Sequence, residues 1–149
     1  LVLTNLHNHV MPFIRYDTGD LAVAGRADCP CGRGLPLIER VEGRTAECIS
    51  DSSGKPVSPM SLSRHLFAQG DYRDAVRHYQ LVQESESRAR LLVVTADGFG
   101  ESMSERLRER LKELLGGSVT IEVEKVKEIP PEKSGKRPLI KPFHYMGVA

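Results

Sequence analysis

The chain has 149 residues, of which 40% are hydrophobic, 28% charged and 5% aromatic. This composition indicates one folded domain, or a small domain with an appendage, and excludes a disordered, collagen-like or disulfide-rich chain. The 21 basic residues nearly balance the 20 acidic residues and Trp is absent, so neither nucleic acid nor an anionic membrane surface is expected as a partner. No segment approaches the roughly 18 apolar residues of a membrane-spanning helix.

The cysteines are Cys29, Cys31 and Cys48, and three thiols cannot all pair within one chain. We therefore expect a reducing, cytoplasmic compartment rather than a disulfide framework. The first residues lack the basic segment and cleavage site of a signal peptide. Because the chain begins with Leu inside a short apolar run, we expect it to be part of a longer protein.

Residues 1–44 predict short strands separated by turns and one loop. A strand at 1–4 is followed by a turn at 5–12, and 13–24 reads as two strands around Thr18-Gly19-Asp20. Residues 26–36 are rich in Gly, Pro and Cys and predict a loop, and 37–44 predicts a further strand. These strands are too few to enclose a core, so we expect residues 1–44 to be the end of a larger domain.

The composition changes after Gly43-Arg44, and the pattern then alternates between strands and helices. The predicted elements are a hairpin within 47–57, a helix at 59–69, a loop at 71–75, strands at 76–84 and 89–95, a helix at 102–115 and a strand at 119–123. This order predicts an α+β fold, in which a small mixed or antiparallel sheet has helices on one face. We assign residues 45–149 to this second, smaller domain.

The helix at 102–115 has the clearest signals. Ser102 and Glu105 have the spacing of a capping box, in which each side chain bonds a free backbone N–H of the first turn. A single apolar stripe, which should face the core, is formed by Met103, Leu107, Leu111, Leu114 and Leu115.

Two motifs in the first part of the chain suggest a ligand. In Arg15–Asp20 (RYDTGD), Gly19 permits a tight turn and the Asp20 carboxylate is suited to accept two hydrogen bonds from a vicinal diol such as a ribose. The alternative is a simple β-turn with a capping Asp. In Glu42-Gly43-Arg44, the guanidinium at the change of composition is suited to face a phosphate or ribose, or is an exposed residue at a strand end.

Two further motifs lie in loops. In Ser134-Gly135-Lys136, a glycine beside the lysine lets the ammonium reach into a cleft and stabilise charge on a phosphate or carboxylate oxygen; the alternative is a solvated basic tail. In Cys29-Pro30-Cys31, two thiolates are half of a tetrahedral zinc site, with His7 and His9 as candidate further ligands, or else they are free thiols or a redox pair.

Together and in this order, the stretches TNLHNHVMPFIRYDTGDL, CPCGRGLPLIERVEGRT and EIPPEKSGKRPLI resemble the C-terminal part of the AMP-forming adenylating enzymes. The resemblance is to the phenylacetate–CoA ligase and CapK-like branch of that group. It implies conversion of a small carboxylate and ATP to an acyl-adenylate, followed by transfer of the acyl group to a thiol, usually that of coenzyme A. ATP, Mg²⁺ and coenzyme A are the implied cofactors, and the remaining adenylating domain is the implied partner.

The resemblance also implies a role for individual residues. Asp20 would hold the ATP ribose hydroxyls, Arg44 would contact the ribose and phosphate region, and Lys136 would neutralise charge during adenylate formation. Arg44, Thr45, Ala46 and Glu47 would form the hinge on which the small domain turns between the two half-reactions.

One position departs from the family pattern, because the family has an acidic residue where this chain has Ala46, with Glu47 beside it. Either Glu47 takes that role, or the hinge differs, or the turning of the small domain is impaired. The phosphate-binding loop and the acyl pocket would lie outside these residues, so the chain alone is expected to have no ligase activity. Two alternatives without catalysis remain: a zinc-knuckle interaction module, and a degenerate lid domain with a structural or regulatory role.

Overall fold

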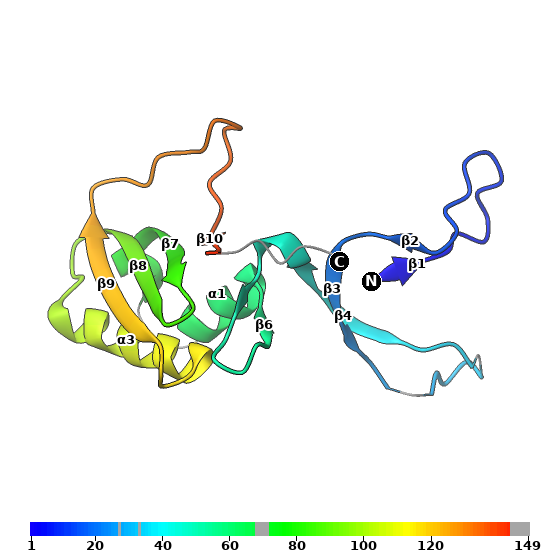
Figure 1. Ribbon diagram of the computed structural model, residues 1–149, viewed down its shortest axis with the longest axis horizontal. Helices are drawn as coiled ribbons and strands as arrows, with labels where there is room; N and C mark the ends of the chain where they lie inside the picture. Colours follow the sequence, from blue (N-terminus) through cyan, green and yellow to red (C-terminus); the bar gives the residue numbers. More distant parts are fainter. Residues whose placement is uncertain (27, 33, 68–71, 144–149) are drawn as a thin grey trace.

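A computed structural model describes residues 1–26, 28–32, 34–67 and 72–143 of the chain. Its first strands form two narrow antiparallel ribbons that project from a more compact part (Figure 1). One ribbon pairs β1 with β2 and the other pairs β3 with β4, so the strands on either side of Thr18 do not pair with each other. The four strands are β1 (Val2–Leu3), β2 (Tyr16–Asp17), β3 (Asp20–Ala24) and β4 (Ile38–Arg44).

The two ribbons have no core of their own. Within the described part of residues 1–41 no residue is buried. Large apolar side chains instead lie open to solvent, with Val10 98% exposed and Leu6 and Ile14 each 72% exposed. Apolar burial is the main source of folding free energy, so contacts within this part of the chain cannot by themselves explain its stability.

The compact part contains a mixed sheet with the strand order β10-β7-β8-β9. β7 and β8 are antiparallel, whereas β10 runs parallel to β7 and β9 runs parallel to β8. The elements from residue 45 onward are η1 (Thr45–Glu47), β5 (Ile49–Ser50), β6 (Pro56–Val57), α1 (Pro59–Phe67), α2 (Tyr72–Ala75), β7 (Val76–Ser85), β8 (Arg88–Thr95), α3 (Glu101–Leu115), β9 (Thr120–Val126) and β10 (Ile140–Lys141).

One face of this sheet packs on α1 and α3 and forms the core. Leu91 and Val93 alternate along β8 and are fully buried against Leu107 and Leu111 of α3. The predicted stripe of α3 is thereby confirmed, with Met103 and Leu114 at its partly buried margins. Truncating a buried leucine of this kind to alanine typically costs roughly 2–5 kcal/mol. The predicted α+β fold with helices on one face is confirmed.

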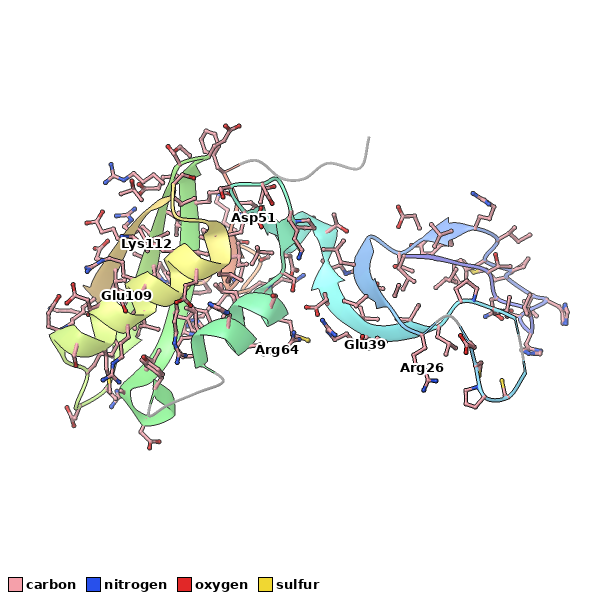
Figure 2. All side chains as sticks on the ribbon, turned by 90° about the horizontal axis from the view of Figure 1, so that it is seen from below. Arg26, Glu39, Asp51, Arg64, Glu109 and Lys112 are labelled. Atoms are coloured by element: carbon pink, nitrogen blue, oxygen red, sulfur yellow. The ribbon has the colours of Figure 1, made fainter. Side chains whose placement is uncertain are left out.

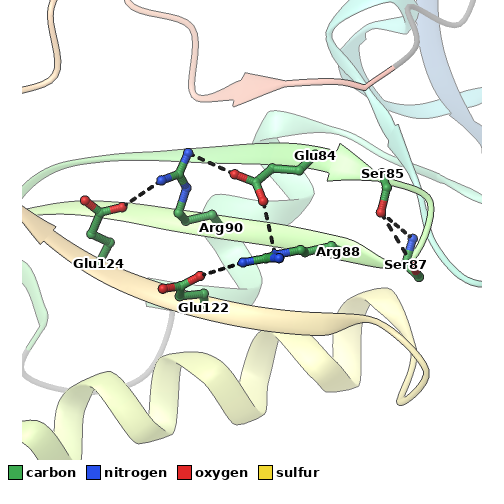
Figure 3. A network of polar contacts seen from close by, with 7 residues as sticks. All are labelled: Glu84, Ser85, Ser87, Arg88, Arg90, Glu122 and Glu124. Carbon is green, nitrogen blue, oxygen red and sulfur yellow. Dashed lines mark hydrogen bonds and ion pairs between the residues drawn. The ribbon is translucent and has the colours of Figure 1, made fainter.

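The opposite face of the sheet carries a network of ion pairs (Figure 3). The Glu84 carboxylate lies 3.2 Å from Arg88 and 2.9 Å from Arg90, and these arginines also pair with Glu122 and Glu124 of β9. Alternate residues of a strand point to opposite faces, so the charged residues of β8 and β9 cover the side away from the helices. Each pair is partly exposed and contributes little on its own.

The start of α3 differs from the prediction. The helix begins at Glu101 with Gly100 as its N-cap, and no side chain caps it. The Gly100 carbonyl accepts from the N–H groups of Met103 and Ser104 at 3.2 and 3.3 Å. Ser102 therefore lies inside the first turn, where its side chain is out of register for a capping box, and that prediction is wrong. Glycine is an acceptable N-cap, which explains why the helix can begin earlier.

A second correction concerns residues 71–75, which the sequence predicts as a loop. Residues Tyr72–Ala75 form the one-turn helix α2 instead, while residue 71 lies outside the described residues. Tyr72 is only 3% exposed, its ring meets Phe67 edge-on, and the Arg110 guanidinium lies 5.4 Å from the ring centre. A single turn has little intrinsic stability, so this packing rather than local sequence accounts for α2.

Gly116 ends α3 in a conformation that excludes other residues. Its φ is +96°, and a Cβ there would lie 2.7 Å from Ser52 Cβ in the turn between β5 and β6. We expect Gly116→Ala to lower the free energy of unfolding by about 2 kcal/mol or more, because strain and overlap add. Gly117→Ala is the matched control, since no atom lies within 4 Å of its Cβ position, and a change within about 0.5 kcal/mol is expected. Urea denaturation measures both, and equal losses would contradict this account.

Candidate functional site

The turn before β3 is built by the Asp-Thr-Gly-Asp segment. The Asp17 carboxylate accepts from the Gly19 N–H at 2.9 Å, and Gly19 takes a φ of +69°, in the left-handed region. The Gly19 carbonyl then accepts from the Thr45 N–H at 2.8 Å. The glycine conformation expected at residue 19 is present, but β2 pairs with β1 and β3 pairs with β4, so the tight turn predicted between two strands at Thr18-Gly19-Asp20 does not form. The segment is bonded directly to Thr45, the residue that follows Arg44.

Asp20 and Arg44 are brought together by strand pairing. Asp20 begins β3 and Arg44 ends β4, and the two are cross-strand partners in the antiparallel register. The Asp20 carboxylate lies 3.4 Å from Arg44 Nε, and their side chains are 26% and 66% exposed. The two motifs that the sequence singled out separately thus form one anion and cation pair at the end of the β3–β4 ribbon, accessible to a ligand.

The expected hinge, Arg44 to Glu47, is a short and open turn. Thr45–Glu47 form the 3₁₀ helix η1, in which no residue is buried. The Cys48 N–H donates to the Thr45 carbonyl at 3.1 Å, and the Cys48 thiol donates to the Arg44 carbonyl at 3.3 Å. Burial raises the pKa of this thiol, so it stays protonated and acts as a donor. The hinge role of these residues stays a prediction.

Lys136 lies in an exposed loop between β9 and β10. The turn is closed by two backbone bonds of 2.8 Å, from the Glu132 N–H to the Lys136 carbonyl and from the Gly135 N–H to the Glu132 carbonyl. Lys136 lines a groove of about 490 Å³ together with Ala46 and Glu47 of the hinge turn. Among the residues the structure describes, no carboxylate pairs with its ammonium. The Lys136 ammonium therefore lies in the same groove as the residues expected to form the hinge.

Gln80 anchors this loop and was not predicted from sequence. Its side chain is 2% exposed, and its amide Nε2 donates to the Pro138 carbonyl at 2.7 Å. The Leu81 N–H donates to the Leu139 carbonyl at 2.9 Å, and β10 then pairs with β7. The sequence carries no clear signal for Gln80, because β7 also carries Arg77, His78, Gln83 and Glu84; only its burial shows that the amide needs a partner.

Glu42 is a second residue that was missed as a functional candidate. It is 9% exposed and belongs to β4, and its Oε1 accepts from Arg40 Nε at 2.5 Å and lies 3.5 Å from Arg64 of α1. Its Oε2 accepts from the Ser58 hydroxyl at 3.1 Å. The pKa of Glu42 is below its ordinary value, chiefly because Arg40 donates to it, with Ser58 and Arg64 acting in the same direction.

Cys29 and Cys31 lie together but do not form a metal centre with other residues. Their sulfur atoms are 2.8 Å apart, closer than the roughly 3.8 Å expected between two thiolates on one tetrahedral zinc ion. Across the described ranges of the chain, no group of three or more His, Cys, Asp or Glu side chains is placed to hold a metal ion. His7 and His9 do not complete such a group, and half of a zinc site remains a prediction.

In the ranges that the structure describes, no helix has the length and apolar character to cross a bilayer.

The fold is similar to that of the C-terminal region of acyl-CoA ligases of known structure. Residues 49–142 match the family model of the CapK C-terminal domain. This match covers more than half of the chain, which therefore belongs to that family, as the sequence motifs predicted.

Individual relatives agree with this assignment. Phenylacetate-coenzyme A ligase of Thermus thermophilus is 27% identical over 158 residues, covering 91% of this chain and 35% of the ligase. A crystal structure of 2-hydroxyisobutyryl-CoA ligase in the postadenylation state, with 2-HIB-AMP, superposes with a TM-score of 0.67 at 22% identity, covering 95% and 31%. An open conformation of that ligase, with 2-HIB-AMP and CoA, gives 0.63 at 20% identity, covering 94% and 31%. The chain thus spans about a third of these relatives.

The role of Gln80 can be tested by Gln80→Leu. The substitution removes the donor to the Pro138 carbonyl, so the loop end should detach from β7 more often and protection of the Leu81 amide from hydrogen exchange should fall by roughly tenfold or more. Gln83→Leu is the matched control in the same strand, and we expect unchanged protection there. Equal protection of the Leu81 amide in both variants would show that Gln80 does not hold the loop.

Proposed function

We propose that this chain is the C-terminal part of an ATP-dependent, AMP-forming carboxylate–CoA ligase. Such an enzyme joins a carboxylate to the α-phosphate of ATP with release of pyrophosphate, and a thiol then displaces AMP to give a thioester. The observation that carries the proposal is that three candidate side chains lie near one turn, η1. Asp20 pairs with Arg44, the residue before η1, and Lys136 lines a groove with Ala46 and Glu47 of η1. The acid, and the choice of coenzyme A as acceptor, depend on residues beyond this chain.

We also propose that residues 1–44 belong to the larger adenylating domain and that 45–149 form the small lid domain. The uncovered apolar side chains of the two ribbons support this division, because a neighbouring domain would bury them. The family match, which begins at residue 49, is consistent with a boundary near residue 45. On this proposal the chain by itself has no ligase activity, and the cytoplasm remains its predicted location.

Asp20 and Arg44 are suited to bind the nucleotide. The Asp20 carboxylate is an acceptor for both hydroxyls of a ribose, and Arg44 beside it is a donor to the same sugar or to a phosphate oxygen. Their ion pair holds the carboxylate in place before the nucleotide arrives. Mg²⁺, when bound with ATP, would offset the charge of its phosphates; the described residues here supply no cluster of carboxylates for it.

Lys136 is suited to the adenylation step. That step brings a carboxylate and a phosphate together, so the negative charge that accumulates between them is stabilised by a positioned cation. An unpaired ammonium on a tight surface turn can approach such a site and withdraw when the domain turns. Glu47 lines the same groove as Ala46, which supports the proposal that it supplies the acidic group that the family has at the hinge.

Lys136→Ala in the protein that carries this chain tests the assignment. With phenylacetate as the first acid tried, we expect ATP–pyrophosphate exchange to fall at least about a hundredfold, because the cation is lost from the transition state. Thioester formation from supplied acyl-adenylate should change far less. Lys133→Ala, in the same loop but outside the groove, is the control and should alter both by less than about twofold. Equal loss of both half-reactions in the Lys136 variant would reject this role.

Asp20→Ala tests the ribose contact. The variant loses the acceptor for the sugar hydroxyls, so the KM for ATP should rise about tenfold or more, since a hydrogen bond to a charged group typically contributes about 1.5–3 kcal/mol. The effect should be smaller with 2′-deoxy-ATP, which lacks one of the hydroxyls. Asp17→Ala removes a carboxylate that bonds within the turn and serves as the control for local damage. An unchanged KM for ATP in the Asp20 variant would contradict the contact.

A further inference from the structure

The junction between the β3–β4 ribbon and the compact part is held by a buried carboxylate. Glu42 is the one charged residue among the buried side chains of the described residues, the others being apolar or neutral. It lies at a cleft of about 410 Å³ between β3, β4 and the start of α1, lined also by Arg40, Ser58 and Ser61. Burying a carboxylate is costly unless it is fully partnered, so its partners show what the burial achieves.

The partners of Glu42 lie on both sides of the hinge turn. Arg40 belongs to the same strand, whereas Ser58 and Arg64 belong to the start and middle of α1. Figure 2 shows Glu39 on the ribbon and Arg64 on α1, on the two sides of this junction. Because residues 44–47 lie between Glu42 and Ser58 in the chain, a rotation about that turn would carry Ser58 and Arg64 with the compact part while Glu42 stays with the ribbon, and the contacts between them would be strained or broken.

Ser58 makes the contact geometrically demanding. Its hydroxyl accepts from the Ser61 N–H at 3.0 Å and so caps the N-terminus of α1, while it donates to Glu42 at 3.1 Å. The carboxylate therefore faces the positive end of the helix dipole as well as Arg64. The lowered pKa of Glu42 agrees with an ionised group that is stabilised on all sides.

We propose that Glu42 is a latch, a positioning residue whose bonds to Ser58 and Arg64 hold the compact part in the orientation seen here and must break before the other half-reaction. The inference rests on the proposed two-step function, and it adds that Glu42 controls the orientation of the compact part. A polar latch suits a moving junction, because charged partners that separate are rehydrated, whereas a separated apolar interface would stay exposed.

The orientation can be measured without turnover, in the full protein that carries this chain. Spin labels at the exposed positions Ala24 of β3 and Lys112 of α3, with Cys29 and Cys31 changed to serine, report the distance between the two parts. We expect a narrow distance distribution in the parent and a broader or shifted one in Glu42→Gln. Glu39→Gln is the matched control, because Glu39 pairs with Arg40 on the same strand and does not cross the junction.

Arg64→Gln is a second variant, at an exposed position, in case Glu42→Gln folds poorly. It should change the distribution in the same direction, and the double variant should add little to either single one. The latch would be overturned if the label distances in both single variants matched those in Glu39→Gln and in the parent. Thermal unfolding of each variant separates loosening of the junction from general loss of stability.

The half-reactions give a second readout. Loss of charged hydrogen bonds of this kind should change the ratio of adenylation to thioester formation by about tenfold. The reason is that the Glu42 contacts stabilise only the orientation described here, so the variant destabilises that orientation and not the other. Equal change of both half-reactions would overturn the latch while leaving the proposed function intact. Altered label distances in a protein without any ligase activity would instead reject the proposed function and leave the junction contact standing.

Discussion

The antiparallel pairing of β3 with β4 is the contact on which the candidate site depends. Its register sets Asp20 opposite Arg44 and delivers the chain into η1 with the Thr45 N–H bonded to the Gly19 carbonyl. A slip of one strand by one residue would place the two side chains on opposite faces of the ribbon. The Asp20–Arg44 pair, which we propose binds the nucleotide, and η1, the proposed hinge, are therefore one structural unit, although they come from motifs that are well separated in the chain.

Lys136 reaches the same region by a different route. Its loop leaves β9 at one edge of the sheet and returns at the other edge as β10, which has only two residues paired with β7. So short a strand is weakly held by its own ladder, and the buried Gln80 amide reinforces it through the Pro138 carbonyl. The position of this loop at the groove thus depends on the hydrogen bond from Gln80 to the Pro138 carbonyl, and not only on the turn that contains Lys136.

The molecule separates its apolar and polar contacts in a way that fits movement. The compact part is stabilised by a conventional core between the sheet and two helices, whereas the junction with the ribbons depends on Glu42 and its hydrogen-bonded partners. An apolar core resists rearrangement because any opening exposes surface to water. Charged and hydroxyl groups can exchange partners with water at little net cost, as the proposed change of orientation would need.

The sequence by itself determined the α+β class, the stripe of α3, the alternation of β9 and the motifs that point to Asp20, Arg44 and Lys136, because these depend on local periodicity and on residue chemistry. It did not determine α2 or β10, since one turn and two residues are too short to form without packing around them. The capping box predicted at Ser102 was wrong because α3 begins at Glu101, with Gly100 as its N-cap. Only the tertiary structure decided that Glu42 meets Ser58 and Arg64 and that Lys136 shares a groove with the hinge, because those contacts join segments that are distant in the chain.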